Sequence, residues 1–186
     1  DYLERARKQS SQAEFATQLL RAGLLIETHE EAEALEGLNE INRSQANHPL
    51  VLRMLRQAYE QLRDEEALHY LLPSLREAKL YPESDLRALE FKIYRSLLDK
   101  RAMTRDATLI REIWRWIPHH VQLQEEIIEA YGRGMIEAGF GNEVEELLRL
   151  ALGREWTPAL LELYGRVNAD DPQKQLQHVQ EWLGPH

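Results

Sequence analysis

Residues 48–80 read HPLVLRMLRQAYEQLRDEEALHYLLPSLREAKL, and this stretch decides the fold. In its first half, apolar side chains recur at three- and four-residue steps: Leu52, Leu55, Tyr59 and Leu62. That spacing is typical of one face of an α-helix. We predict helices over residues 49–62 and 65–79, and because so few residues connect them, the two should pack antiparallel as a hairpin.

The same helical spacing continues along nearly the whole chain, with no strand-like alternation of useful length. Further helices are predicted over residues 12–26, 29–43, 84–99, 107–117, 119–138, 142–152, 158–168 and 172–183. Thr157 and Asp171 each precede a Pro, which fits the first position of a helix because its missing N–H costs nothing there. Thr28 is followed three residues later by Glu31, and Asn142 by Glu145. Each pair is expected to satisfy free N–H groups at the start of a helix.

Tyrosines inside the predicted helices repeat at a nearly constant distance. Tyr59, Tyr94, Tyr131 and Tyr164 follow one another at intervals of 35, 37 and 33 residues. This is close to the 34-residue period of tetratricopeptide repeats (TPR), in which each hairpin is one repeat. The rings are expected to fill the space between paired helices. The fold prediction is therefore all-α: antiparallel helix-hairpin repeats in a TPR-like α-solenoid with a right-handed superhelical twist.

The match to the TPR pattern is degenerate, because the Gly expected after the Leu is replaced in every repeat, by Arg56, Phe91, Ile128 and Leu161. Only 9 Gly and 7 Pro occur, and the prolines are spread at intervals, so no segment has the composition of a flexible linker. We predict one continuous domain over residues 1–186.

Composition excludes several classes of function. The formal net charge of −9 argues against non-specific nucleic-acid binding, which needs a basic face. No apolar run approaches the roughly 20 residues that cross a bilayer, and no signal-peptide pattern occurs. The chain has no Cys, which excludes disulfides and thiolate zinc sites.

The two ends of the sequence suggest that the repeat array is truncated. Tyr2, Leu3 and Ala6 form a helical stripe with no cap before it, which we interpret as the tail of a helix from an earlier repeat. Gly184, Pro185 and His186 are interpreted as the entry to another helix. Because repeat arrays need polar capping units, apolar surface is expected at one or both ends, with self-association through it.

Four segments, in this order and spacing, resemble the HemY family of membrane-anchored TPR proteins associated with haem (protohaem IX) biosynthesis. They are YLERA at residues 2–6, the stretch at 48–80, LIREIWRW at 109–116 and DDPQKQLQHVQEWLGPH at 170–186. The resemblance implies two membrane helices and a first repeat before Asp1, and at least one further repeat after His186. It also implies an inner-membrane location with this domain on the cytoplasmic face.

The resemblance carries no catalytic signature, so it implies a pathway without a chemical step. We expect a non-catalytic protein–protein interaction scaffold that docks late haem-biosynthesis enzymes and needs no cofactor. A general assembly scaffold at the envelope is left open.

Histidine and tryptophan residues near one helix junction offer an alternative function. His119 and His120 are adjacent, so on a helix their side chains point about 100 degrees apart and cannot easily share a metal. No metal site is therefore predicted. One His can still be an axial haem ligand, and with Trp114 and Trp116 it would form a tetrapyrrole-binding module. The other interpretation is that both tryptophans pack at the junction before Pro118.

Candidate catalytic groups are lacking. Adjacent carboxylates such as Glu125 and Glu126 usually solvate a helix surface, whereas acid–base catalysis needs partly buried groups that converge in a pocket. Gly132, Gly134, Gly139 and Gly141 lie within or between predicted helices and are interpreted as points of helix crossing or capping. We predict no catalytic residues.

The remaining candidate surface is the concave face that the first helix of each TPR pair lines. Its positions flank each Tyr or lie one turn earlier, and they hold charged and amide side chains: Arg53, Gln57, Glu60, Gln61, Lys92, Arg95, Glu125, Glu129, Arg133, Glu162 and Arg166. Such a mixed face suits a peptide of complementary charge. The alternative for each of these residues is that it is merely solvated.

Overall fold

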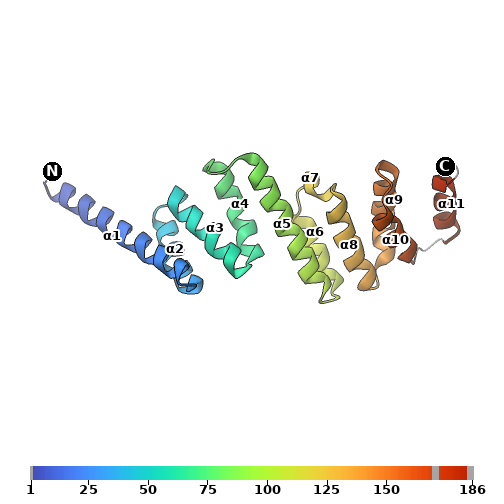
Figure 1. Cartoon of the computed structure of the whole chain (residues 1–186), viewed down its shortest axis with the longest axis horizontal. Coiled ribbons are helices and arrows are strands. Elements are labelled where there is room, and N and C mark those ends of the chain that lie inside the picture. Colours follow the sequence, from blue (N-terminus) through green and yellow to red (C-terminus); the bar gives the residue numbers. More distant parts are fainter. Residues whose placement is uncertain (1, 169–171, 184–186) are drawn as a thin grey trace. The chain divides into compact units, whose positions relative to one another are not determined.

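The computed structural model describes residues 2–168 and 172–183, and the regular structure of these residues is helical throughout (Figure 1). The α-helices are α1 (Tyr2–Glu27), α2 (Glu31–Ser44), α3 (Pro49–Leu62), α4 (Glu65–Glu77), α5 (Glu83–Ala102), α6 (Ala107–Trp116), α7 (His119–Gln122), α8 (Glu125–Glu137), α9 (Glu145–Arg154), α10 (Pro158–Arg166) and α11 (Pro172–Leu183), and η1 (Gly141–Val144) is a 3₁₀ helix. The all-α prediction is confirmed.

Contacts divide the chain into two compact units, residues 1–93 and 94–186, with α5 contributing to both. In each unit, helices pack mainly on their neighbours in the sequence, as they do in a helical-hairpin solenoid. The superhelical twist and the single continuous domain concern the arrangement of the whole chain and stay predictions.

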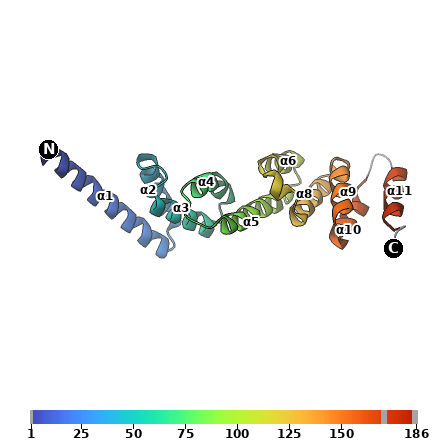
Figure 2. The same cartoon turned by 90° about the horizontal axis from the view of Figure 1, so that it is seen from above.

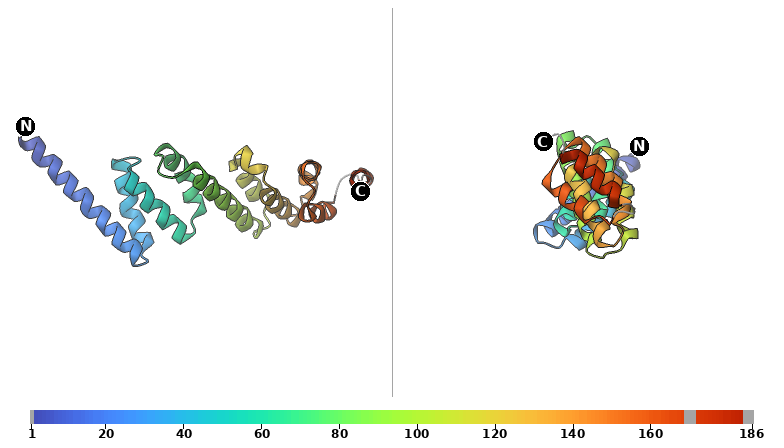
Figure 3. Two further views of the ribbon diagram at one scale, coloured as in Figure 1. Left: turned by 45° about the horizontal axis from the view of Figure 1, so that its top comes forward. Right: turned by 90° about the vertical axis from the view of Figure 1, so that its right-hand side faces the viewer.

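In the first unit, α1 packs on α2, α2 on α3 and α3 on α4, and α1 also contacts α3 (Figure 2). The core between these helices is built from fully buried aliphatic side chains, among them Leu38, Val51, Leu52, Leu55 and Leu75. Figure 3 shows that α1 extends well past the end of α2, so only its C-terminal half is covered by that helix.

In the second unit, α8 is the central helix and contacts α6, α7, η1, α9 and α10. Its core contains Ile110, Ile113, Ile127 and Leu148. Gly134 marks a close crossing, because a Cβ on it would lie 3.1 Å from the Cβ of Ala102. Helix crossing, one of the two interpretations made from the sequence, is therefore confirmed for this glycine.

Short turns join the helices, and two local features mark where one helix ends and the next begins. Non-glycine residues with positive φ stand in five of the turns: His29, Asn47, Arg63, Lys79 and Arg105. The next helix can then begin with a capping side chain, as when the carboxylate of Asp64 accepts a hydrogen bond from the N–H of Ala67 at 3.0 Å.

The predicted caps have three different outcomes. Thr157 caps α10 and is followed by Pro158 at the first position, as expected. Thr28 does not cap α2, since its hydroxyl donates back to the carbonyl of Leu24 at the end of α1. Asn142 does not cap either, because residues 141–144 form the 3₁₀ helix η1. Asp171 lies outside the described residues.

Two predicted helix boundaries are wrong. The apolar stripe at the start is not the tail of a separate helix, because α1 runs without a break from Tyr2 to Glu27, and no Gly or Pro interrupts residues 2–22. The helix predicted over residues 119–138 is two helices, because Gln124 takes an extended conformation between α7 and α8. The amide of Gln122 donates to the carbonyl of Trp114 at 2.9 Å and so holds α7 against the end of α6.

The repeated tyrosines lie where helices contact one another, although the hydroxyl contact of Tyr59 and the ring stacking of Tyr131 are with an earlier helix and not with the second helix of their predicted pair. Tyr94, Tyr131 and Tyr164 are buried, whereas Tyr59 is only half-buried. The hydroxyl of Tyr59 reaches Asn39 on the preceding helix at 3.4 Å, and that of Tyr164 reaches Glu145 on the preceding helix at 2.7 Å. Tyr59 and Tyr164 therefore each connect their own helix to the one before it.

Candidate functional site

The concave-face residues predicted from the sequence lie on four helices. In the first unit these are α3, with Arg53, Gln57, Glu60 and Gln61, and the first part of α5, with Lys92. In the second unit they are the rest of α5, with Arg95, then α8, with Glu125, Glu129 and Arg133, and α10, with Glu162 and Arg166. We describe the two sets separately because they belong to different units.

In the first unit, an exposed polar row runs along α3. Arg53, Gln57 and Gln61 follow one another at four-residue steps, so their side chains share one face of the helix, and all three are exposed. Lys92 on α5 is exposed as well. None of these four side chains forms a hydrogen bond or an ion pair with another described residue, so each is available to a partner.

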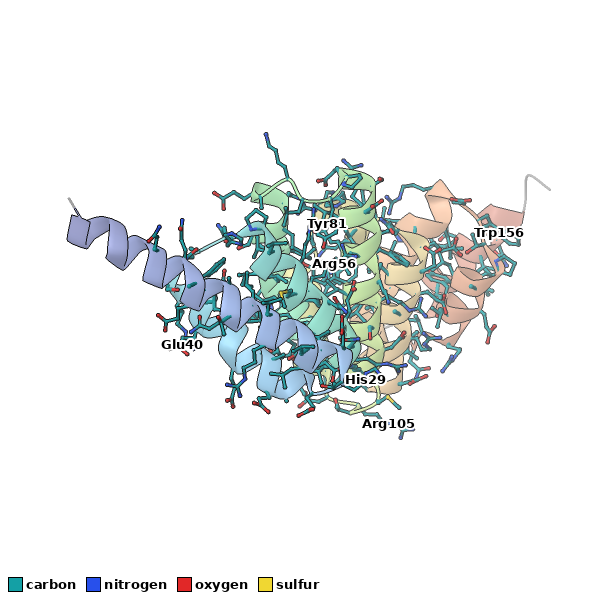
Figure 4. All side chains as sticks on the ribbon, turned by 60° about the vertical axis from the view of Figure 1, so that its left-hand side comes forward. His29, Glu40, Arg56, Tyr81, Arg105 and Trp156 are labelled. Atoms are coloured by element: carbon teal, nitrogen blue, oxygen red, sulfur yellow. The ribbon has the colours of Figure 1, made fainter. Side chains whose placement is uncertain are left out.

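Glu60 differs from that row because the fold already uses its carboxylate. Arg56 donates to it at 3.2 Å, and the guanidinium of Arg56 also lies over the ring of Tyr81, 4.3 Å from its centroid (Figure 4). Sequence reasoning missed Arg56 and Tyr81. The four-residue step from Arg56 to Glu60 was a signal for the ion pair, but nothing in the sequence places Tyr81 beside them.

In the second unit, four side chains form a closed ring of alternating charge. Arg95 donates to Asp99 at 3.0 Å and lies 3.8 Å from Glu129, while Arg133 lies 3.2 Å from Glu129 and 3.3 Å from Asp99. Arg95 also donates to the main-chain carbonyl of Glu126 at 2.6 Å. The ring therefore ties α5 to α8 and has no net charge.

Three of these ring residues, Arg95, Glu129 and Arg133, were predicted as separate contacts for a partner. The structure brings them together, with Asp99 as the fourth member. The sequence signal for Asp99 is its position four residues after Arg95 on the same helix.

The other predicted residues of the second unit are more loosely placed. Glu125 is half-buried at the start of α8, and Glu162 is exposed on α10 without a hydrogen bond or ion pair to another described residue. Arg166 approaches Glu137 at 3.9 Å, but both side chains are largely exposed. Such an exposed pair contributes little to stability.

The histidines and tryptophans of the tetrapyrrole alternative differ in their surroundings. Trp114 stacks on Tyr131 with ring centroids 4.1 Å apart and an interplanar angle of 17°. Its ring is thus engaged in packing α6 on α8, and burial raises the pKa of Tyr131 beneath it. Trp116 is half-buried, and His119 and His120 are exposed at the start of α7.

Sequence reasoning missed two polar groups, each built around one buried residue. Glu90 on α5 is 2% exposed and lies 3.4 Å from Arg76 on α4. Its position was readable, since Leu86, Leu89 and Ile93 define a buried face of α5 that includes residue 90. Desolvation lowers the pKa of His69, and nearby Glu90 partly opposes that shift.

The second group surrounds the hydroxyl of Tyr164, which donates to Glu145 and lies 3.3 Å from Nδ1 of His178 on α11. Burial and the Glu145 carboxylate raise the pKa of Tyr164 well above its ordinary value. The amide of Gln175 adds a hydrogen bond to the carbonyl of Tyr164 at 2.7 Å. These polar contacts attach α11 to α10.

In the described part of the chain, no three His, Asp or Glu side chains are grouped so that they could hold a metal ion. None of the described helices combines the length and the apolar character needed to span a bilayer.

Comparison with known proteins finds a distant similarity to HemY. The chain is 23% identical over 173 residues to Protein HemY of Escherichia coli strain K12, and the match covers 93% of the chain and 44% of that relative. Protein HemY of Escherichia coli O157:H7 and that of Shigella flexneri match to the same extent. No family model matches the chain, and no solved structure matches it. The chain thus resembles HemY over nearly its whole length, while it spans less than half the length of these curated relatives.

Proposed function

We propose that this chain is a non-catalytic, TPR-like docking domain of a HemY-like protein, and that it binds late haem-biosynthesis enzymes through exposed side chains of its concave face. The full protein would be anchored in the inner membrane, with this domain on the cytoplasmic side. The proposal is supported by the similarity to HemY over 93% of the chain and by the helical-hairpin repeats. The observation that carries it is the unpaired row on α3.

That row has the properties of a recognition surface. Arg53, Gln57 and Gln61 are exposed at regular steps on one helix, and Lys92 lies on the other candidate helix of the same unit. A side chain without an internal partner gives up hydration and rotamer freedom when a partner binds, but it breaks no internal contact, so a new ion pair can add specificity and speed up association. A partner with carboxylates spaced to meet Arg53 and Lys92 would fit this surface.

The second candidate is a tetrapyrrole-binding module, favoured by the exposure of His119 and His120 beside a half-buried tryptophan. Trp114 gives it less support than the sequence did, since the ring is stacked on Tyr131. A general assembly scaffold at the envelope is the third, and it differs from the first only in the identity of the partner.

The test measures the affinity of this chain for purified enzymes of the late steps of haem synthesis by thermophoresis, one enzyme at a time. Two double charge reversals are compared with the wild type. Arg53→Glu with Lys92→Glu should weaken the complex about tenfold, because two attractions become repulsions. The matched control is Lys79→Glu with Arg105→Glu, two exposed cations in turns, and it should change affinity less than about twofold.

Both double variants should keep the helical circular dichroism and the melting temperature of the wild type, because all four side chains are exposed. Equal affinity for wild type and the Arg53/Lys92 variant would remove the concave face of the first unit from the proposal. If none of these enzymes binds, the general scaffold replaces the haem-specific one.

A further inference from the structure

A cleft opens between α1 and α2, and none of the predicted concave-face residues lines it. Its volume is about 270 Å³. It has an apolar floor, in which Ala22 and Ala34 are almost fully buried and Leu25 is half-buried. Three residues connect the two helices, so they run antiparallel and form a furrow along their shared length.

The rim of this cleft on α2 is a row of carboxylates. Glu33, Glu36 and Glu40 are all exposed and stand at positions one turn and two turns apart on one face of the helix. Glu40 projects away from the ribbon in Figure 4. The cleft has one cation, Arg21 on α1, and it forms an ion pair with Glu33.

Two of the three rim carboxylates, Glu36 and Glu40, have no opposite charge paired with them in the described part of the chain. Glu36 and Glu40 form no hydrogen bond or ion pair with another described residue, and neither does Arg43 one turn further along α2. The mouth of the cleft has an excess of two negative charges above an apolar floor. The complementary ligand is cationic on its edges and apolar at its centre.

Gly37 is a second, independent observation in the same cleft. It stands in the middle of α2, where Gly is less favourable than Ala. Nothing lies within 4 Å of the position that its Cβ would take, so packing inside the described chain does not require a glycine there. Gly153 and Gly165 also have open space, but they belong to the last turns of their helices. A glycine inside a furrow lets another main chain approach closely.

We propose that the α1/α2 cleft binds a basic amphipathic helix of a partner protein. The furrow between two antiparallel helices fits a third helix, whose apolar residues would lie over Ala22, Ala34 and Gly37. Lys or Arg residues one turn apart on that helix would pair with Glu36 and Glu40. This site involves none of the residues of the proposed concave face, so the two can succeed or fail separately.

The experiment uses the whole chain and a fluorescent helical peptide of about 16 residues, long enough to hold helical structure. Its sequence places Leu on one face and Lys at four-residue steps beside it, and a comparison peptide carries Glu in place of Lys. Fluorescence anisotropy at low ionic strength should show saturable one-to-one binding of the Lys peptide and none of the Glu peptide. High salt should weaken the binding, because the rim charges are exposed.

Three variants locate the binding. Glu36→Lys with Glu40→Lys should weaken it about tenfold or more, whereas Glu27→Lys with Glu112→Lys makes the same change of net charge at exposed sites elsewhere and should change it less than about twofold. Gly37→Leu changes no charge but fills the cleft, and it should also weaken binding about tenfold. Circular dichroism must show that each variant is folded, and Gly37→Ala provides a milder replacement if Gly37→Leu is not.

Several results would overturn the proposal. Equal loss of binding in both double charge variants would mean that the peptide responds only to net charge. Unchanged binding by Gly37→Leu would place the peptide outside the cleft. Dimerisation in sedimentation experiments that Glu36→Lys with Glu40→Lys abolishes would make a second copy of the chain the occupant. The Arg53/Lys92 variant should bind the peptide like wild type, which separates this site from the proposed function.

Discussion

Replacing Arg95 with Ala tests whether the charges at the start of the second unit stabilise the fold or are available to bind a partner. Arg95 lies in the ring with Asp99, Glu129 and Arg133 and also donates to the carbonyl of Glu126. Lys92 is the matched control, because it lies three residues earlier on the same helix, is exposed and has no ion pair with a described residue.

The expected loss of stability follows from the contacts of Arg95. A hydrogen bond to a charged group contributes about 1.5–3 kcal/mol when well buried, whereas an exposed ion pair contributes about 0–1 kcal/mol. The Arg95 side chain is 26% exposed and that of Asp99 is 47% exposed, so the ring lies between these cases. We expect Arg95→Ala to cost about 1–2 kcal/mol and Lys92→Ala to stay within about 0.5 kcal/mol.

Urea denaturation followed by circular dichroism measures this difference, since a change in midpoint at constant slope reports stability. Thermal melting should agree, with a decrease of about 2–4 °C per kcal/mol for a chain of this size. A double-mutant cycle with Asp99→Ala should give a coupling energy of at least about 0.5 kcal/mol. If Arg95→Ala is as mild as Lys92→Ala, the ring does not stabilise the fold, and Arg95 returns to the set of free docking residues.

Three further predictions concern other sites. Pro73 is exposed inside α4 and lacks the N–H that a helix interior uses. Pro73→Ala should therefore raise the free energy of unfolding by about 1–3 kcal/mol, measured as a higher urea midpoint. No increase would show that α4 accommodates the pyrrolidine of Pro73 without a loss of stability. Tyr164→Phe should cost about 1–2 kcal/mol near neutral pH by removing the hydrogen bond to Glu145. The pKa of Tyr164 is raised in the folded state, so its contribution to stability is complete below the ordinary tyrosine pKa of about 10 and is lost as pH rises above it. The melting temperatures of variant and wild type should therefore converge at alkaline pH. A difference in melting temperature that does not change with pH would contradict the raised pKa. Haemin titration followed at the Soret band should show no saturable change that depends on His119 and His120, whereas a one-to-one change that His119→Ala with His120→Ala abolishes would favour the tetrapyrrole module.

The helices and their packing were predictable because local spacing determines them. Apolar residues at three- and four-residue steps predict a helix and its buried face from a few turns of sequence, and the repeated tyrosines indicated the period of the helical hairpins. The errors arose where local signals were balanced. Thr28 could bond forward to the next helix or back to Leu24, and the turn at His29, with its positive φ, leaves it close to the end of α1.

The candidate site was less predictable because it depends on contacts between helices. A residue at a TPR groove position can face a partner or pair with a charge on the next helix, and the sequence gives the same signal for both. Glu129 illustrates this, since its partners Arg95 and Arg133 lie 34 residues before it and four residues after it. Only the second of these was open to local reasoning.

The positions of paired and unpaired charges indicate which helix faces are the better candidates for partner binding. A ligand that used Arg95 or Arg133 would have to separate each from its carboxylates, so the loss of internal contacts would offset most of the new interaction. Arg53 on α3 and Glu40 on α2 have no such contacts to lose within the described chain. Both side chains are exposed, so each lies on a helix face that is open to solvent within the described chain. Binding there adds contacts without removing any, and this is the physical reason to look for partners at those two faces before the neutral ring.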